Sequence, residues 1–396
     1  MTGQPLHGID VLDLGQLYNG PYCSLILSYL GADVVKVEPP SGELLRSRVE
    51  EGEPPELVMM NSSKRGITLN LKSDDGRDLF TDLVAESDVL VENFAADTME
   101  GLGLGYDTLS EINPGLVYAH GSGFGERGPY RKYPAMDLTI QALGGVMDVT
   151  GFPDQPPVKT GIAVADFLGG IHLATGVVSA LFRRERTGEG DFVEVSMHDT
   201  VYPTLASPLA SHFHGEDTLA RTGNRHSGLA HCPYNVYETA DGYIAVFCVS
   251  DEHWVRLTEA LDRPDLAADP RFDTNVDRTA HMDEIDAEIE GETRQYERDA
   301  LAARLREADV PCGPVKSLEE VADDPHLRER GMIHKLDHPD YDGEIGVPGQ
   351  PIRLAGAPGP EITPSPTRGE HNADILGDWL GLTEAEVERL EDEGAL

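Results

Sequence analysis

The start of the chain alternates short apolar runs with a helical segment, and this pattern constrains the fold more than any other feature. Residues Ile9 to Leu14 (IDVLDL) have the composition of a buried strand, Pro21 to Leu30 that of a helix, and Val34 to Val37 that of a second strand. Strand, helix and strand in this order form a βαβ unit, whose two strands lie parallel in one sheet. We therefore expect a parallel sheet with helices packed on it.

The same alternation continues through the first half of the chain. Further strand candidates begin at Asp88 (DVLVENF) and Leu116 (LVYAHGSGF), with helical stretches between them. This predicts a Rossmann-like, doubly wound α/β sheet, in which ligands bind at the carboxyl ends of the strands. The loops beginning at Gly15, Asn93 and Gly121 are therefore the expected site.

A change in the sequence pattern near residue 220 predicts a second domain. Before it come an apolar helix, from Phe167 to about Arg184, and the strand DFVEVSM; after it come a hairpin and charged helices. The last segment contains apolar strand material (IRLAGAP) and two helices, from Ala373 and from Glu384. We expect a large Rossmann-like domain and a small α+β domain, with the boundaries 1–220 (large), 221–325 (small) and 326–396 (returning to the large domain).

The net charge constrains the surroundings of the protein. The chain has 71 Asp and Glu against 31 Lys and Arg, of which seven are lysine, so its charge is −40 at pH 7. Such a surface repels itself in dilute solution, whereas molar salt shortens the Debye length to about 3 Å. The acidic residues are spread from Glu38 to Glu393 rather than gathered in a block that would dock on a basic partner. We therefore expect a halophilic protein that binds neither nucleic acid nor anionic membranes.

Cysteine spacing and hydropathy favour a cytoplasmic protein. The four cysteines, Cys23, Cys232, Cys248 and Cys312, form no C-x-x-C pair that would suggest a disulfide framework or a zinc site. The N-terminus lacks a basic region followed by an apolar run, and no stretch of about 18 apolar residues is evident. We therefore expect a soluble, cytoplasmic chain.

Three familiar catalytic patterns are missing from the sequence. The loop GQLYNG lacks G-x-G-x-x-G, so we interpret Glu38, at the end of the second strand, as a solvated strand end rather than a ribose ligand. No G-x-S-x-G occurs, and His120 has no evident triad partner. The 14 histidines are scattered, so we expect no metal.

Asp166 stands directly before the apolar helix that we expect from Phe167. An Asp at this position most often caps the helix. The helix N-terminus also favours an ionised carboxylate, which is a nucleophile that needs no base. Gly169 and Gly170 would let another backbone or a ligand approach closely. Asp137, in PAMD, is a second candidate acid, for which we expect a structural hydrogen-bonding role.

Six ordered blocks of the sequence carry a family resemblance. They are LDLGQLYNGPYCSLILSYLGADVVKVEPP, NSSKRGITLNLKSDDGRDL, VENFAADTMEGLGLGYDTLSEINPGLVYAHGSGFGERGPY, GIAVADFLGGIHLATGVVSALFRRERTGEG, DVPCGPVKSLEEVADDPHL and GEHNADIL. Together they resemble the family III CoA-transferases, the group that contains formyl-CoA and carnitine CoA-transferases. The resemblance spans essentially the whole chain.

The resemblance implies an assembly and a set of site residues. The assembly is an interlocked, ring-like homodimer, in which each subunit threads through a ring formed by the other. Asp166 falls on the catalytic nucleophile of the family. The positions that contact CoA fall on Leu17, Tyr18, Leu69, Asn70, Leu71, Lys72, Asn93, Phe94, Pro134, Ala135, Met136 and Asp137. CoA thioesters would be substrates, with no tightly bound cofactor.

Two positions depart from the family pattern. An arginine that relatives carry just after the second strand is Pro39 here, and another, after the Asn-Phe pair, is Gly101. We therefore expect the nucleotide end of CoA to be held by other cations, such as Arg46, Arg48, Lys64 or Arg131.

The resemblance implies transfer of CoA from an acyl-CoA to a small carboxylic acid through an aspartyl intermediate. By analogy with the family, we expect an acidic, halophilic member to act on small dicarboxylates, with succinyl-CoA as donor and mesaconate, citramalate or itaconate as acceptor. A 2-methylacyl-CoA racemase is the first alternative, but it needs a histidine base where this chain has Met136. A catalytically silent CoA-binding protein is the second, and the retained Asp166 opposes it.

The charge leads to a test in salt. Because screening offsets the self-repulsion of the −40 chain, we expect the melting temperature to rise steeply between about 0.1 and 2 M KCl. Circular dichroism melts would measure the rise, with sucrose as a control that does not screen charge. Unchanged melting in dilute buffer would contradict the halophilic interpretation.

Overall fold

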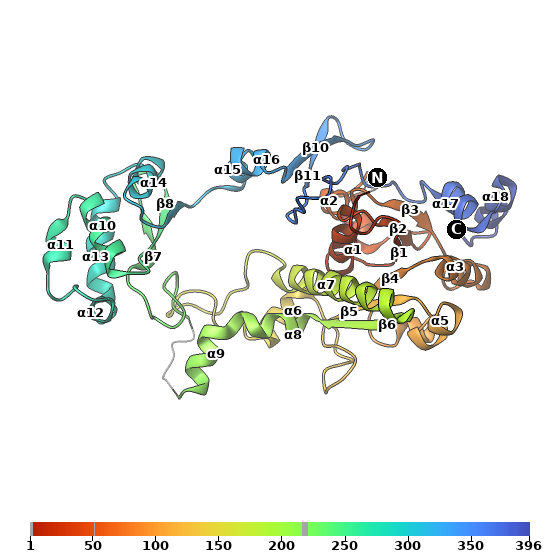
Figure 1. The fold of residues 1–396 in the computed structure, drawn as a ribbon, viewed down its shortest axis with the longest axis horizontal. Helices are drawn as coiled ribbons and strands as arrows, with labels where there is room; N and C mark the ends of the chain where they lie inside the picture. Colours follow the sequence, from red (N-terminus) through yellow and green to blue (C-terminus); the bar gives the residue numbers. More distant parts are fainter. Residues whose placement is uncertain (1–2, 51, 216–220) are drawn as a thin grey trace. The chain divides into compact units, whose positions relative to one another are not determined.

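The computed structural model describes residues 3–50, 52–215 and 221–396 (Figure 1). The chain divides into two compact units. Unit 1 comprises residues 1–143, 162–203 and 324–396, and unit 2 comprises residues 144–161 and 204–323. Unit 2 thus begins before the expected boundary and also takes in a short earlier segment. The expected boundary itself adjoins positions 216–220, which lie outside the described residues.

A six-stranded, fully parallel sheet forms the centre of unit 1. Its order is β3-β2-β1-β4-β5-β6, with β1 Asp10–Asp13, β2 Asp33–Glu38, β3 Arg65–Thr68, β4 Val89–Glu92, β5 Val117–Ser122 and β6 Asp191–Ser196. The strand order reverses between β1 and β4, so the loops that follow these two strands diverge. In doubly wound sheets this point is the crevice where ligands bind.

Helices cover both faces of the sheet, as the ribbon shows (Figure 1). On one face, α1 (Asn19–Tyr29) and α7 (Val164–Thr187) bury Leu27 and Leu173 against Val11 and Val117. The other face is covered by α3 (Asp74–Glu86), α5 (Tyr106–Ile112), α17 (Asn372–Leu380) and α18 (Glu384–Asp392). Unit 1 is therefore a mixed α/β fold of the doubly wound kind.

Helix α7 is long and apolar enough to cross a membrane by length and composition, although we expected no such stretch. Packing explains much of this apolar character, because Leu173 and Val177 are buried against the sheet. Ile171, Val178 and Phe182 are exposed in the single chain. The helix therefore has one face in the core and a second, apolar face on the surface.

Shorter elements complete unit 1. They are η1 (Leu44–Arg48), α2 (Pro55–Asn61), α4 (Thr98–Gly101), α6 (Asp137–Leu143), α8 (Met197–Val201), α16 (Pro325–Glu329) and the hairpin β10 (Ile333–Asp337) and β11 (Glu344–Pro348). The segment IRLAGAP was expected to be a strand, but it is irregular, and Ile352 and Leu354 are exposed. Prolines at both ends, Pro351 and Pro358, cannot donate to a sheet ladder.

Unit 2 combines an antiparallel sheet with helices. Its three strands lie in the order β7-β8-β9, with β7 Tyr234–Glu238, β8 Tyr243–Phe247 and β9 Cys312–Pro314. The helices are α9 (Ala206–Phe213), α10 (Asp251–Ala260), α11 (Pro264–Ala268), α12 (Asn275–Thr279), α13 (Met282–Thr293), α14 (Arg298–Glu307) and α15 (Leu318–Ala322). The 3-10 turn η2 (Tyr202–Leu205) precedes α9 at the unit boundary. Trp254, Phe272 and Leu301 belong to one core, so unit 2 has a hydrophobic core of its own.

Candidate functional site

The loop after β1 is anchored by buried charge. Asp13 Oδ2 accepts hydrogen bonds from Lys64 Nζ at 2.8 Å and from Ser24 Oγ at 2.6 Å, while Oδ1 accepts from the Gly15 amide at 2.8 Å. The side chains of Asp13 and Lys64 are both 0% exposed. Burial alone would raise the pKa of Asp13, but Lys64 holds it below its ordinary value. This carboxylate therefore stays ionised inside the core.

Lys64 does not hold CoA, contrary to the expectation from the sequence. Its ammonium group also donates to the Pro21 carbonyl at 3.0 Å and to Asn61 Oδ1 at 2.9 Å. Burial lowers its pKa to about 8. An ammonium group has three donors, and these buried partners use all of them, so Lys64 is a structural residue.

Glu38 is buried, whereas we expected a solvated strand end. Its carboxylate accepts hydrogen bonds from Arg46 Nε at 2.7 Å and from the Glu43 amide at 2.9 Å. Arg46 also forms an ion pair with Glu53. Of the expected cations, Arg46 is therefore committed to two carboxylates. Arg48 is more exposed and lies 3.4 Å from Glu56.

Asn93, after β4, fastens the loop that follows β1. Its Oδ1 accepts a hydrogen bond from the Gln16 amide at 2.7 Å, and its Nδ2 donates to the Gln16 carbonyl at 3.0 Å. Leu17 has φ of 62°, a left-handed conformation that is rare for a residue with a β-carbon, and its amide donates to Glu43 Oε2 at 3.1 Å. The two loops at the sheet crevice are thus bound to each other.

A charged network stands behind Phe94. The Phe94 amide donates to Glu92 Oε2 at 2.8 Å, and Glu92 Oε1 is hydrogen-bonded to His120 Nδ1. His120 Nε2 lies 3.2 Å from Glu126. Burial would lower the pKa of His120, but Glu92 and Glu126 raise it. His120, for which the sequence shows no evident triad partner, therefore lies between two carboxylates and supports the loop of Phe94.

Asp166 lies in the first turn of α7. The helix begins at Val164 with Ala163 as N-cap residue, so the expected start at Phe167 is wrong by three residues. Burial, and then the negative charge of Asp137, raise the pKa of Asp166 to about 7. A half-buried carboxylate that titrates near neutrality is a candidate functional group.

Asp137 performs the capping that we expected of Asp166. Asp137 Oδ1 accepts hydrogen bonds from the Ala165 amide at 2.8 Å and the Asp166 amide at 3.4 Å, while Oδ2 accepts from Gln141 Nε2 at 2.6 Å. The hydrogen-bonding role expected of Asp137 is therefore present. The carboxylate of Asp166 therefore does not cap the helix.

Glycines bring α7 against α1, as Gly169 and Gly170 suggested. A β-carbon on Gly169 would lie 2.1 Å from Asn19 Nδ2, and one on Gly121, at the end of β5, would lie 2.2 Å from Asn19 Oδ1. Asn19 Nδ2 donates to the Asp166 carbonyl at 3.3 Å. Asn19 therefore positions the Asp166 backbone, and sequence reasoning missed it because the contact joins helices far apart in the chain.

Two cavities lie at the carboxyl ends of the strands. The first, of about 460 Å³, is lined by Asp166 together with the predicted residues Leu17, Asn93, Phe94, Pro134, Ala135 and Met136. The second, of about 730 Å³, is lined by the predicted residues Leu69, Asn70, Leu71, Lys72 and Phe94, and by Pro39 and Gly101. Gln16 and Phe94 line both cavities. We call them the Asp166 cavity and the large cavity.

Two predicted residues, Tyr18 and Asp137, line neither cavity. The Tyr18 ring stacks on Phe167 with 6.0 Å between centroids, and its hydroxyl accepts a hydrogen bond from Arg48 at 3.3 Å. Asp137 caps α7 as described above. The other ten predicted CoA positions thus line the walls of the two cavities. Tyr18 and Asp137 instead make supporting contacts.

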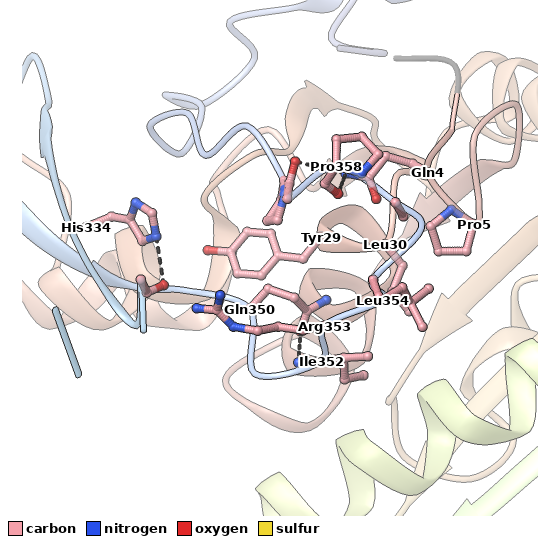
Figure 2. A pocket seen from close by; sticks show the side chains of 15 residues that line it. Gln4, Pro5, Tyr29, Leu30, His334, Gln350, Ile352, Arg353, Leu354 and Pro358 are labelled. Carbon is pink, nitrogen blue, oxygen red and sulfur yellow. Dashed lines mark hydrogen bonds between the residues drawn. The ribbon is translucent and has the colours of Figure 1, made fainter. Parts of the chain in front are cut away.

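A third cavity, of about 500 Å³, lies between the N-terminal segment, the end of α1 and residues 350–360 (Figure 2). Tyr29, His334, Gln350 and Arg353 line it, and none of the predicted site residues does. Tyr29 ends α1, so this cavity lies about 15 Å along the helix from Asn19. Across residues 3–50, 52–215 and 221–396, no group of three or more His, Cys, Asp or Glu could hold a metal ion.

Comparison with known proteins agrees with this arrangement. The profile of a family described as CoA-transferase family III matches residues 6–372. The chain is 38% identical over 387 residues to the succinyl-CoA:mesaconate CoA-transferase of Haloarcula marismortui, covering 94% of this chain and 95% of that protein. It is 35% identical to the formyl-CoA:oxalate CoA-transferase of Streptomyces coelicolor, with 100% of both chains covered. A CaiB/BaiF family protein from Brucella suis has a solved structure that superposes with a TM-score of 0.85 and 35% identity, covering 96% of this chain and 100% of that one.

The buried ion pair can be tested by unfolding. Lys64→Met would leave the buried Asp13 carboxylate unpaired, so we expect a loss of about 3–5 kcal/mol in the free energy of unfolding. Denaturant titration at constant KCl would measure it. Arg389→Met, which removes an exposed ion pair with Glu393, should cost at most about 1 kcal/mol. If adding Asp13→Asn to Lys64→Met recovered no stability, the loss would not come from the unpaired carboxylate.

The ionisation of Asp166 can be tested by pH. Its pKa is raised from 3.8 to about 7 in the folded chain, so the stability linked to its proton is present below about pH 4 and is lost as the pH rises to 7. Asp166→Asn, which stays neutral, should therefore gain stability over the unmodified protein at about pH 8 but not at about pH 4. Denaturant titrations at both pH values would measure the difference. A difference independent of pH would contradict the raised pKa.

Proposed function

This chain belongs to CoA-transferase family III, and we propose that it moves CoA from succinyl-CoA to mesaconate or a related dicarboxylate through a covalent intermediate on Asp166. It is an enzyme that transfers CoA, as its relatives are. The observation that carries the proposal is the position of Asp166. The half-buried carboxylate of Asp166 lines the Asp166 cavity, and the large cavity, at the same strand ends, shares the lining residues Gln16 and Phe94 with it.

In the proposed mechanism the Asp166 carboxylate attacks the carbonyl carbon of the donor thioester. The carbon–sulfur bond breaks, leaving a mixed anhydride and the CoA thiolate. The thiolate then attacks the Asp166 carbonyl, which releases the donor acid as a carboxylate and forms an aspartyl-CoA thioester. The acceptor carboxylate attacks this thioester, which releases the CoA thiolate and forms a second anhydride, between Asp166 and the acceptor. The thiolate then attacks the acyl carbon of the acceptor, which forms the new CoA thioester and releases Asp166 as a carboxylate.

The surroundings of Asp166 suit this role. Burial removes water from the carboxylate, and Asp137 adds a negative charge, so the ionised form is less stabilised than in solution. Asp137 accepts hydrogen bonds from the Ala165 and Asp166 amides in the first turn of α7, so these two amides do not bind the attacking oxygen of Asp166. With a pKa of about 7, a substantial fraction of Asp166 is ionised at neutral pH without a separate base.

Two features support the dicarboxylate substrates and the setting. The relatives include the mesaconate enzyme of Haloarcula marismortui and, at 36% identity over 393 residues, the succinyl-CoA–D-citramalate CoA-transferase of Chloroflexus aurantiacus, with 98% of this chain and 97% of that one covered. The charge of −40 is the second, and it fits the cytoplasm of a halophile. The relatives therefore support small dicarboxylate substrates, and the charge supports a setting of high salt.

We also propose that the enzyme is the interlocked homodimer that the family resemblance implies. The support is the apolar outer face of α7, where Ile171, Val178 and Phe182 are exposed in the single chain. Exposed apolar side chains along one helix can mark an interface. Covering it with a second copy would remove the exposed apolar surface from water.

The racemase alternative has no support in the site. Racemisation needs one base to remove the α-proton and a second acid to return it on the opposite face. Met136 lines the Asp166 cavity and is 56% exposed, but its thioether cannot accept this proton. Among the described lining residues of this cavity, Asp166 is the carboxylate, and there is no histidine.

The proposal predicts a covalent adduct on one peptide. During turnover with succinyl-CoA, hydroxylamine or borohydride should modify the peptide that contains Asp166, because an aspartyl thioester or anhydride reacts with both. Mass spectrometry of the digested protein would locate the adduct. Asp166→Ala should lower transfer by about a thousandfold or more. Labelling of another peptide would refute the assignment.

Folding and reaction class supply the controls. Asp137 rather than Asp166 caps α7, so Asp166→Ala should keep the cap, whereas Asp137→Ala should lose about 0.5–2 kcal/mol of stability. A 2-methylacyl-CoA incubated in deuterated water without an acceptor acid should exchange no α-proton. Rapid exchange would refute the transferase mechanism in favour of racemisation.

A further inference from the structure

A cluster of ion pairs joins the two cavities, and the proposed chemistry at Asp166 does not use it. Asp97 lines the large cavity, whereas Arg131 and Lys132 line the Asp166 cavity. Arg131 Nη2 donates to Asp97 Oδ1 at 2.6 Å, and Lys132 Nζ lies 2.6 Å from Asp97 Oδ2. One carboxylate from the wall of the large cavity therefore binds two cations from the wall of the Asp166 cavity.

Both cations of the cluster are paired with carboxylates. Arg131 also donates through Nε to Glu126 at 2.9 Å, so two cations face two carboxylates. The cations hold the pKa of Asp97 well below its usual range, with the hydrogen bond from Arg131 as the largest cause, so this carboxylate is ionised at neutral pH. Among the described residues that line the two cavities, Lys72 is the other cation. A multiply charged anion would therefore meet cations that are already neutralised.

Asp97 is placed so that it can give up these cations. Its side chain is 45% exposed and that of Lys132 is 73% exposed, and ion pairs in such positions contribute little to stability. Its backbone is left-handed, with φ of 66°, which is uncommon for a residue with a β-carbon. A phosphate can accept two hydrogen bonds from one arginine, whereas Asp97 accepts one from Arg131. Water can solvate the released carboxylate.

We propose that the diphosphate of CoA displaces Asp97 from Arg131 and Lys132 when the substrate binds. In the free enzyme Asp97 binds both cations, and it competes with the phosphate for them. The inference rests on the proposed function, because it requires the thioester of CoA at Asp166 and its nucleotide in the large cavity. The diphosphate joins the nucleotide to the pantetheine arm, so it belongs where the cavities meet.

The first test removes the competitor. Asp97→Asn keeps the shape and tolerates the left-handed backbone, but loses the charge. We expect it to bind free CoA about threefold or more tightly than the unmodified enzyme, measured by isothermal titration calorimetry at constant KCl. Asp262→Asn is the matched control, because Asp262 is also left-handed at φ of 59° and lies 2.7 Å from Arg304 in unit 2. Asp262 lines none of the cavities described, so its replacement should leave CoA affinity unchanged. Unchanged or weaker binding by Asp97→Asn would overturn the inference.

The second test removes the cations one at a time. Arg131→Gln and Lys132→Gln should each weaken CoA binding about tenfold, with the same loss for 3′-dephospho-CoA and none for pantetheine, which has no phosphate. Arg304→Gln is the control for loss of a paired arginine. Free CoA carries no acyl carboxylate, so a loss confined to succinyl-CoA would instead assign these cations to the succinyl group.

The remaining outcomes are also decisive. A loss that disappears with 3′-dephospho-CoA would assign the cations to the 3′-phosphate, and an equal loss with pantetheine would assign them to the arm or to folding. Either result would overturn the diphosphate assignment while leaving the transferase function intact. If the unmodified enzyme bound no CoA at all, the proposed function would fail together with the inference.

Discussion

The ion pair between Asp13 and Lys64 holds the sheet together at the carboxyl ends of its strands. Asp13 ends β1, Lys64 immediately precedes β3, and their shared partner Ser24 lies on α1. Neither charge has access to water, so each is tolerated only because the other is present. Asp13 also binds the Gly15 amide, so the loop that follows β1 is fixed to the same point. The positions of both cavities depend on this loop.

The neighbouring carboxylate of Asp137 helps to set the pKa of Asp166. The N-terminus of a helix normally stabilises an ionised acid in its first turn. Here Asp137 accepts hydrogen bonds from two amides of that turn, and its negative charge opposes ionisation of Asp166. The helix cap and the raised pKa thus belong to two different acids. The residue without the cap keeps a carboxylate that titrates near the pH at which it would act.

Local sequence patterns predicted the parts of this fold that depend on local physics. The strands from Ile9, Val34, Asp88 and Leu116 follow from apolar runs, and the rule that ligands bind at carboxyl strand ends pointed to the loops that line the cavities. The pairings Asp13–Lys64 and Glu38–Arg46 could not be foreseen in the same way, because packing determines which charges become buried. For that reason a strand end expected in water, and a lysine expected on a ligand, both lie in the interior.

The contact between α1 and α7 restricts how the sequence can drift. The side chain of Asn19 packs directly against Gly121 and Gly169. A β-carbon on either glycine would clash with this side chain unless Asn19 moved. A β-carbon at Gly169 becomes acceptable only after residue 19 has become smaller, so the order of substitutions matters. Segments about 150 residues apart in the chain must therefore change together. It follows that a chimera that joined α1 of one relative to α7 of another would need both partners of this contact from the same parent.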